Sequence, residues 1–538
     1  MPTDCISYSE TNYFSKLILD YLDKKEELSP FYNRFPEIGN FEAQIKEKQQ
    51  SFPSENRRVL VQSLQQQYEG LEMSEATLAN IEALSKDTTF TITTGHQLNL
   101  FTGPLYFLYK IISVINLTKI LKKEHPEYDF VPIYWMATED HDFAEINYFN
   151  LNGKKFQWNS EEKGAGIDAV GYLSTDGLAE VFELFAAEIG GGKDAEYLKS
   201  LFKNAYLKHA NLTEATRYLA NELFKDYGLV IMGAQQPELK KLFIPYAENE
   251  LLEQRSFEST IEKTEKLSNL GYNVQVNPRE INLFYLNNGY RERIIKREGK
   301  FYVHEKQIEW TTKEILAELH EHPQYFSPNV MMRPLYQEVI LPNLCYIGGG
   351  GELAYWLELK DYFEAENVLF PMLLLRNSAL LQTEKQQEKR QKLDISNKEL
   401  FLKQHELINR KVRKISNIDI DFSKQKEHLV HQFAAMYDLA EKTDKSFLGA
   451  VKAQEVKQLK GLDHLEKRLL KAQKRKLKDE VSRIADLQNQ LFPNKSLQER
   501  QNNFSEVYAI YGQQLLDTLF EHLNPLEQHF KILTFGTK

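Results

Sequence analysis

The first two-thirds of the chain alternates short apolar runs with segments of helical periodicity. Several of these runs are apolar without interruption, which is typical of strands that are covered on both faces. We expect strands at 88–93, 130–137, 229–233, 272–276, 344–348 and 368–375. Because helical segments follow most of them, the pattern predicts an α/β fold with a doubly wound, mostly parallel sheet.

Two stretches do not fit a minimal core of this kind. Residues 160–226 are mostly helical in pattern and precede a predicted strand. Residues 270–310 have the pattern of β-hairpins, with an Asn-Gly turn at Asn288 and Gly289. We interpret both stretches as insertions into a core domain that spans residues 1–377.

The pattern changes after about residue 378, where the chain becomes dense in Lys, Glu and Gln and lacks proline until Pro493. Apolar residues recur there every seven positions, at Leu393, Leu400 and Leu407 and again at Leu470, Leu477, Ile484 and Leu491. Seven-residue spacing indicates a coiled-coil seam. We therefore expect an antiparallel coiled-coil domain at 378–495, followed by a helical segment at 496–538 that packs back on the core.

Composition narrows the classes of function. The 538 residues are 42% hydrophobic and carry a net charge of −10, which argues against bulk binding of nucleic acid or acidic lipid. Two cysteines, Cys5 and Cys345, cannot form a cysteine-rich zinc site. No signal peptide is evident, and the most apolar late run is too short to span a membrane. We expect a cytoplasmic protein with no membrane or nucleic-acid partner, and interpret the basic run 467–478 as a solvated helix face, with RNA binding as the alternative.

The first candidate site is the junction "TTGHQLN", residues 93–99, between a predicted strand and a helix from about Pro104. Ligands of open α/β sheets lie at the carboxyl ends of strands, and helix N-termini attract anions. Gly95 would let the backbone approach a ligand, and His96 could donate to a phosphate oxygen. The pattern T-x-G-H is similar to the (H/T)-x-G-H signature of class I nucleotidyltransferases and synthetases. The alternative is an ordinary turn with a capping histidine.

The second candidate is "TEDHDFAE", residues 138–145, which follows the next predicted strand. Its ionisable residues are Glu139, Asp140, His141, Asp142 and Glu145. Such density is unfavourable unless cations or hydrogen bonds offset it. The cluster could recognise a cationic amine, supply a general base at His141 or Asp142, or hold a divalent metal. No second cluster completes a metal site, so we predict none; the alternative is a set of capping and turn residues.

The third candidate combines a glycine run with the helix before it. Gly348 to Gly351 follow a predicted strand and begin a helix, which leaves the backbone open to an anion. An arginine one turn from a glutamine on the preceding helix could hold a carboxylate or phosphate bidentately. Two aromatic residues could stack on a ring, although one of them is expected in the core. The candidate binding residues are Arg333, Gln337, Gly349, Gly350, Gly351, Glu352, Tyr355 and Trp356.

Four segments in order, "TGHQLNLFTGPLY", "TEDHDFAE", "GGGELAYW" and the late "LDHLEKRLLKAQKRK", resemble the bacillithiol biosynthesis cysteine-adding enzyme family, BshC. The resemblance covers essentially the whole chain. It implies a Rossmann-like core with two connecting-peptide insertions, and a coiled-coil domain through which the family forms a homodimer. The implied reaction is the last step of bacillithiol synthesis, in which cysteine is joined by an amide bond to the amine of glucosaminyl-malate.

The same resemblance implies roles for the candidate residues. ATP would activate the cysteine carboxylate, and its phosphates would lie against Thr94, Gly95 and His96, with Gln97 and Asn99 nearby. The acids of 139–145 would hold the amine, and Arg333 or the glycine run would take the malate carboxylates. His96, His141 and Asp142 are the candidate catalytic residues. The alternatives are a scaffold whose Rossmann core is catalytically degenerate, and a synthetase-like RNA-binding protein.

Overall fold

The computed structural model describes residues 3–160, 168–287, 289–303 and 307–536. Its centre is a five-stranded parallel sheet, in the order β14-β13-β2-β3-β6. The strands are β2 (Thr89–His96), β3 (Asp129–Met136), β6 (Val230–Gly233), β13 (Asn343–Gly348) and β14 (Met372–Leu375). The chain builds outward from β2 in one direction and then returns to build outward in the other, so the topological switch point lies between β2 and β13. The doubly wound α/β fold is confirmed.

The core strands are buried because their sequences are apolar on both faces, and helices cover them. α6 (Tyr106–Glu124) packs along β2 and β3, and α3 (Phe41–Ser51) packs on β13. The strand expected at 272–276 is wrong. The backbone N–H of Gln275 donates instead to the carboxylate of buried Glu358, at 2.8 Å, so a side chain replaces a strand partner there.

A hairpin that the pattern did not predict, β4 (Tyr148–Leu151) and β5 (Lys154–Gln157), precedes the stretch 160–226. The described residues of that stretch are mostly helical and form α8 (Leu178–Ile189), α9 (Lys193–Tyr206) and α10 (Leu212–Phe224). The second predicted insertion contains β7 (Leu283–Asn287), β8 (Tyr290–Arg293), β9 (Ile295–Arg297), β10 (Lys300–Val303) and β11 (Ile308–Trp310). Of the predicted Asn-Gly turn, Asn288 lies outside the described residues and Gly289 has φ of 91°.

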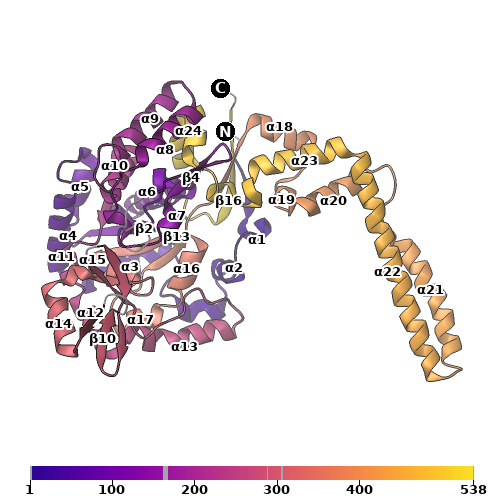
Figure 1. Cartoon of the computed structure of the whole chain (residues 1–538), viewed down its shortest axis with the longest axis horizontal. Helices are drawn as coiled ribbons and strands as arrows, with labels where there is room; N and C mark the ends of the chain where they lie inside the picture. The colour runs from indigo at the N-terminus through magenta and orange to yellow at the C-terminus, as the bar shows by residue number, and fades with distance from the viewer. Residues whose placement is uncertain (1–2, 161–167, 288, 304–306, 537–538) are drawn as a thin grey trace.

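The coiled-coil domain is a helical hairpin that projects from the body of the molecule (Figure 1). α21 (Ser423–Ala440) and α22 (Lys445–Lys476) pack side by side, and Asp444 caps the start of α22 by accepting from the N–H of Ser446 at 2.7 Å. α20 (Gln404–Ile415) and α23 (Lys478–Leu491) pair at the base of this arm. The seven-residue repeat is only partly a seam: Leu407, Ile484 and Leu491 are buried on α20 and α23. Leu393 and Leu400, however, end two separate short helices, and Leu477 lies at the break between α22 and α23.

The base of the arm rests on a small sheet that joins distant parts of the chain. Its order is β1-β16-β15, formed by β1 (Thr3–Ser7), β16 (His529–Phe535) and β15 (Ala379–Thr383). The segment 496–538 does contain α24 (Phe504–Tyr511) and α25 (Gln514–His522), but its last element is a strand rather than a helix. Across the ranges that the structure describes, no helix has the length and apolarity needed to cross a membrane.

Candidate functional site

The carboxyl ends of β2 and β13 meet at the switch point, and Arg333 reaches this place from α15 (Arg333–Ile340). A Cβ added to Gly95 would lie 3.1 Å from the hydroxyl of Tyr346 and 3.9 Å from Nη1 of Arg333. Glycine at position 95 therefore leaves room between the backbone of β2 and the guanidinium. Tyr346 comes from β13, so both strands contribute to this space.

The hydrogen-bond partners of Arg333 are neutral groups. Nη1 donates to Oε1 of Gln337 at 3.1 Å, and Nη2 donates to the hydroxyl of Tyr355 at 3.3 Å. The guanidinium carbon lies 5.9 Å from the ring centroid of Trp135 and 5.7 Å from that of Tyr346. Within the described ranges no carboxylate lies close enough to form an ion pair with it. A partly buried arginine in such surroundings is suited to bind a carboxylate or phosphate bidentately.

Lys110, which the sequence did not single out, is buried next to this site. Its Nζ is 2.6 Å from Oε2 of Glu352 and 2.7 Å from the carbonyl oxygen of Gly95. Glu352 also accepts from the hydroxyl of Tyr346 at 2.7 Å and from the N–H of Gly349 at 2.8 Å. Burial raises the pKa of Glu352, but Lys110 and these donors together hold it below its usual value.

Glu352 therefore occupies the N-terminus of α16 (Gly350–Trp356), where the sequence predicted an anion of the substrate. The N–H of Gly349 is used by this side chain, as in a capping box. A Cβ on Gly350 would lie 3.3 Å from Ile18, whereas Gly351 faces open space. The glycine run thus brings α16 and its carboxylate close to Lys110.

His96 is buried, with 6% of its surface exposed, between the rings of Tyr106 and Phe107. Burial, and then the charge of Lys110, lower its pKa to about 3, so the imidazole is neutral at pH 7. Its Nε2 has no hydrogen-bond partner among the described residues. A neutral imidazole with one unused nitrogen at the strand end can bind a ligand but cannot add positive charge for a phosphate.

Two predicted binding residues, Thr94 and Trp356, instead have buried side chains that contact other parts of the protein core. The hydroxyl of Thr94 donates to the carbonyl oxygen of Ile347 at 2.7 Å, inside the sheet. Trp356 is fully buried and stacks on Tyr346 with ring centroids 4.6 Å apart. Of the two aromatic residues on α16, Tyr355 is the one whose hydroxyl meets Arg333.

The acidic segment after β3 is ordered by amide side chains. Nε2 of Gln97 donates to Oδ2 of Asp140 at 2.8 Å and to Oε2 of Glu145 at 2.9 Å. Nδ2 of Asn99 donates to the backbone carbonyl of Glu145 at 3.2 Å. Two carboxylates thus converge on one amide at the carboxyl edge of the sheet, where Glu145 is exposed and Asp140 half-buried.

The other members of this segment point to different partners. Glu139 lies 2.8 Å from Nζ of Lys240 and accepts from Ser327 at 2.9 Å. Asp142 caps α7 (Phe143–Ile146). Nδ1 of His141 lies 2.9 Å from Nη1 of Arg291, which comes from β8 of the second insertion. The five residues therefore do not form one set, and among the described residues no group of three or more His, Cys, Asp or Glu side chains could hold a metal ion.

Arg291 changes what His141 can do. A guanidinium only donates, so Nδ1 accepts and the ring proton stays on Nε2. Burial, and then the charge of Arg291, lower the pKa of His141, which keeps the ring neutral. In this arrangement His141 can donate through Nε2, whereas Asp140 and Glu145 remain available as bases.

A pocket of about 370 Å³ opens beside the acidic segment. Its lining includes Gln97, Asn99 and Glu145 from the core, and also Arg500 and Gln501 from the segment that follows the helical arm. This segment is anchored to the core by the buried pair Arg376 and Glu499, whose Nη2 and Oε1 are 2.7 Å apart. The pocket is therefore built from both parts of the chain. Its lining residues are Gln97, Asn99, Gly103, Pro104, Tyr106, Glu145, Tyr148, Phe149, Asn150, Ser496, Arg500 and Gln501.

The fold and site define a Rossmann-like α/β protein with a coiled-coil domain and, at its switch point, an arginine whose hydrogen-bond partners are neutral. Two family models match: "Bacillithiol biosynthesis BshC, N-terminal Rossmann-like domain" over residues 1–377, and "Bacillithiol biosynthesis BshC, C-terminal coiled-coil domain" over residues 379–535. The chain belongs to the BshC family of bacillithiol biosynthesis.

Relatives extend over the whole chain. A protein from Christiangramia forsetii is 70% identical over 536 residues, which is 100% of both chains. Proteins from Flavobacterium johnsoniae and Flavobacterium psychrophilum are 60% and 57% identical and match 99% of this chain, covering 100% and 99% of their own lengths. All three bear the name "Putative cysteine ligase BshC". The resemblance found in the sequence is thus confirmed.

Proposed function

We propose that this chain is a ligase that joins cysteine to glucosaminyl-malate through an amide bond, with ATP activating the cysteine carboxylate. Family membership and the name that its relatives bear support a cysteine ligase. The observation that carries the choice of substrate is Arg333, a partly buried guanidinium beside Gly95 whose hydrogen-bond partners are both neutral. Malate supplies the carboxylates that such a group binds.

The amine of the sugar would lie against the acidic segment. Asp140 and Glu145, held together by Gln97, offer two carboxylate oxygens to an ammonium group. One of them would accept the proton that must leave before the nitrogen can attack an acyl group. His141, neutral and with its proton on Nε2, would donate to a substrate oxygen rather than act as the base.

We place ATP in the pocket that Gln97 and Asn99 share with Arg500. Its volume of about 370 Å³ is within the usual range for small-molecule sites. Arg500 is exposed on the pocket wall and would supply positive charge for phosphates. His96 and Lys110 do not supply it, because His96 is neutral and Lys110 is paired with Glu352.

The test is reconstitution with purified protein. Cysteine and glucosaminyl-malate are incubated with the chain, with and without ATP, and the products are measured by mass spectrometry. We expect bacillithiol only when ATP is present, and at least about tenfold less with Arg333→Met at limiting glucosaminyl-malate, as loss of a charged hydrogen bond implies. Absence of product while all substrates stay intact would contradict the proposal.

A further inference from the structure

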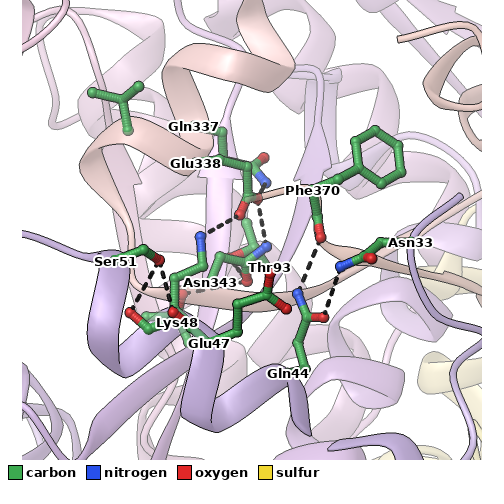
Figure 2. Close-up of polar contacts among 12 residues, drawn as sticks. Asn33, Gln44, Glu47, Lys48, Ser51, Thr93, Gln337, Glu338, Asn343 and Phe370 are labelled. Atoms are coloured by element: carbon green, nitrogen blue, oxygen red, sulfur yellow. Dashed lines mark hydrogen bonds and ion pairs between the residues drawn. The ribbon is translucent and has the colours of Figure 1, made fainter. Parts of the chain in front are cut away.

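A second lysine–glutamate pair is buried behind Arg333. Nζ of Lys48, on α3, lies 3.3 Å from Oε2 of Glu338, on α15, and their side chains are 2% and 0% exposed (Figure 2). Removing two charges from water is costly, and apolar residues of similar volume often give equal or greater stability. Stability alone therefore does not explain why this pair is present.

The pair belongs to a chain of hydrogen bonds that leads to Arg333. Oε1 of Glu338 accepts from Nδ2 of Asn343 at 2.7 Å and from Nε2 of Gln337 at 3.0 Å (Figure 2). Because Nδ2 of Asn343 faces the carboxylate, its Oδ1 faces the hydroxyl of Thr93, from which it accepts at 2.9 Å. Lys48 thus holds the carboxylate of Glu338, and this carboxylate orients the amides of Gln337 and Asn343.

The orientation of Gln337 follows from this chemistry. Burial raises the pKa of Glu338 above its usual value, and Lys48 with the amides of Asn343 and Gln337 offsets part of this rise. Because Nζ of Lys48 lies 3.3 Å away and both amides turn donors toward the carboxylate, Glu338 acts here as an acceptor, and the NH₂ group of Gln337 faces it. Its oxygen is then left to face Arg333, and it accepts from Nη1 at 3.1 Å. If the amide turned over, it would present donors to a guanidinium that also has only donors.

We infer that Lys48 and Glu338 are positioning residues, which fix the amide of Gln337 and through it aim the guanidinium of Arg333 at a substrate carboxylate beside Gly95. The inference rests on the proposed function, in which Arg333 binds glucosaminyl-malate. The arrangement also keeps the charge of Arg333 available. Its immediate partner is a neutral amide, and the acid behind that amide is balanced by Lys48.

The variant that tests this is Lys48→Met with Glu338→Met, which removes both charges together and leaves neither buried alone. We expect the KM for glucosaminyl-malate to rise at least about tenfold, the loss typical of a misplaced charged hydrogen bond. The KM for cysteine should stay within about twofold, because independent sites do not couple. A matched control is Lys411→Met with Glu399→Gln, which removes another buried lysine pair, 3.0 Å apart, in the coiled-coil domain.

The same two changes made in a Gln337→Leu variant distinguish a positioning role from a general loss of structure. In Gln337→Leu the link to Arg333 is already absent, so adding the Lys48 and Glu338 changes should alter the KM for glucosaminyl-malate by less than about twofold. If the two effects instead multiply, or if the pair variant has a wild-type KM, the inference is wrong.

A crystal structure of the Lys48→Met, Glu338→Met protein gives an answer that does not depend on ligase activity. We expect the guanidinium of Arg333 to leave its place beside Gly95 and Gln337. An unmoved guanidinium overturns the positioning role. Wild-type protein that makes no bacillithiol overturns the proposed function instead, and the position of Arg333 in the crystal still decides this inference.

Discussion

Replacing His96 with glutamine should make the protein less sensitive to acid. His96 is buried against Tyr106 and Phe107, and its pKa falls from 6.5 to about 3 on folding. Below pH 6.5 the unfolded chain binds a proton at this position, whereas the folded protein does not until about pH 3. Because the unfolded state then binds more protons, the free energy of unfolding falls as the pH falls through this window.

The size of the effect follows from the shift. Each pH unit within the window changes the free energy of unfolding by about 1.4 kcal/mol for one proton. Between pH 6 and pH 4 the wild-type protein should therefore lose about 2.5 kcal/mol more than His96→Gln. Other groups titrate alike in both proteins, so the difference isolates the imidazole.

Urea unfolding at the two pH values measures this difference. Trp135 and Trp356 are buried in the core, so tryptophan fluorescence reports unfolding of the Rossmann-like part of the chain. His96→Phe, which suits the aromatic neighbours, should show the same reduced sensitivity. If wild type and both variants lose stability equally between pH 6 and pH 4, His96 is not held neutral by burial and the reasoning is refuted.

Arg333→Lys keeps the positive charge but loses the planar fork, so steady-state kinetics should show the KM for glucosaminyl-malate raised by about tenfold to a hundredfold; an unchanged KM would show that Arg333 does not hold this substrate. Lys110→Met leaves Glu352 without its cation, so urea unfolding should show a loss of about 3–5 kcal/mol, and adding Glu352→Gln should restore more than half of it. No recovery in the double variant would contradict the pairing. We also propose that the chain forms a homodimer through the helical hairpin, on which Leu439 and Leu448 are 60% and 40% exposed. Leu439→Asp with Leu448→Asp should convert this homodimer to monomers in light scattering without changing core unfolding. A dimer that persists would place the interface elsewhere.

The parts of the fold that the sequence predicts well are those set by local pattern. Strands β2, β3, β6, β13 and β14 are continuous apolar runs, and their burial on both faces makes them recognisable. The helices after residue 378 are predictable for a similar reason, because a seven-residue repeat of apolar residues is itself a local pattern. The contact between Arg333 and Gln337 was also accessible, since residues four apart on a helix are neighbours.

The remaining features depend on partners that local pattern does not reveal. β16 forms a strand because β1 and β15, far away in the chain, supply its hydrogen bonds. The acids of the segment after β3 look alike in sequence, yet Glu139 pairs with Lys240 while Asp140 binds Gln97. The spacing of these acids along the chain does not predict which partner each of them binds.

Lys110 is the exception that could have been found. It is the one charged residue in "YFLYKIISVINL", the mostly apolar first part of α6, and a lysine in that setting needs a buried partner. The partner is Glu352, which the sequence had assigned to substrate. A buried lysine on the helix after a candidate loop is thus a signal that nearby carboxylates are already occupied.

The most direct test of the account is a crystal structure of this chain with glucosaminyl-malate bound. We predict that a malate carboxylate lies within hydrogen-bond distance of the Arg333 guanidinium beside Gly95, and that the sugar amine faces Asp140 and Glu145. Arg333 does not hold the substrate if the ligand is ordered elsewhere while the guanidinium still contacts only Gln337 and Tyr355.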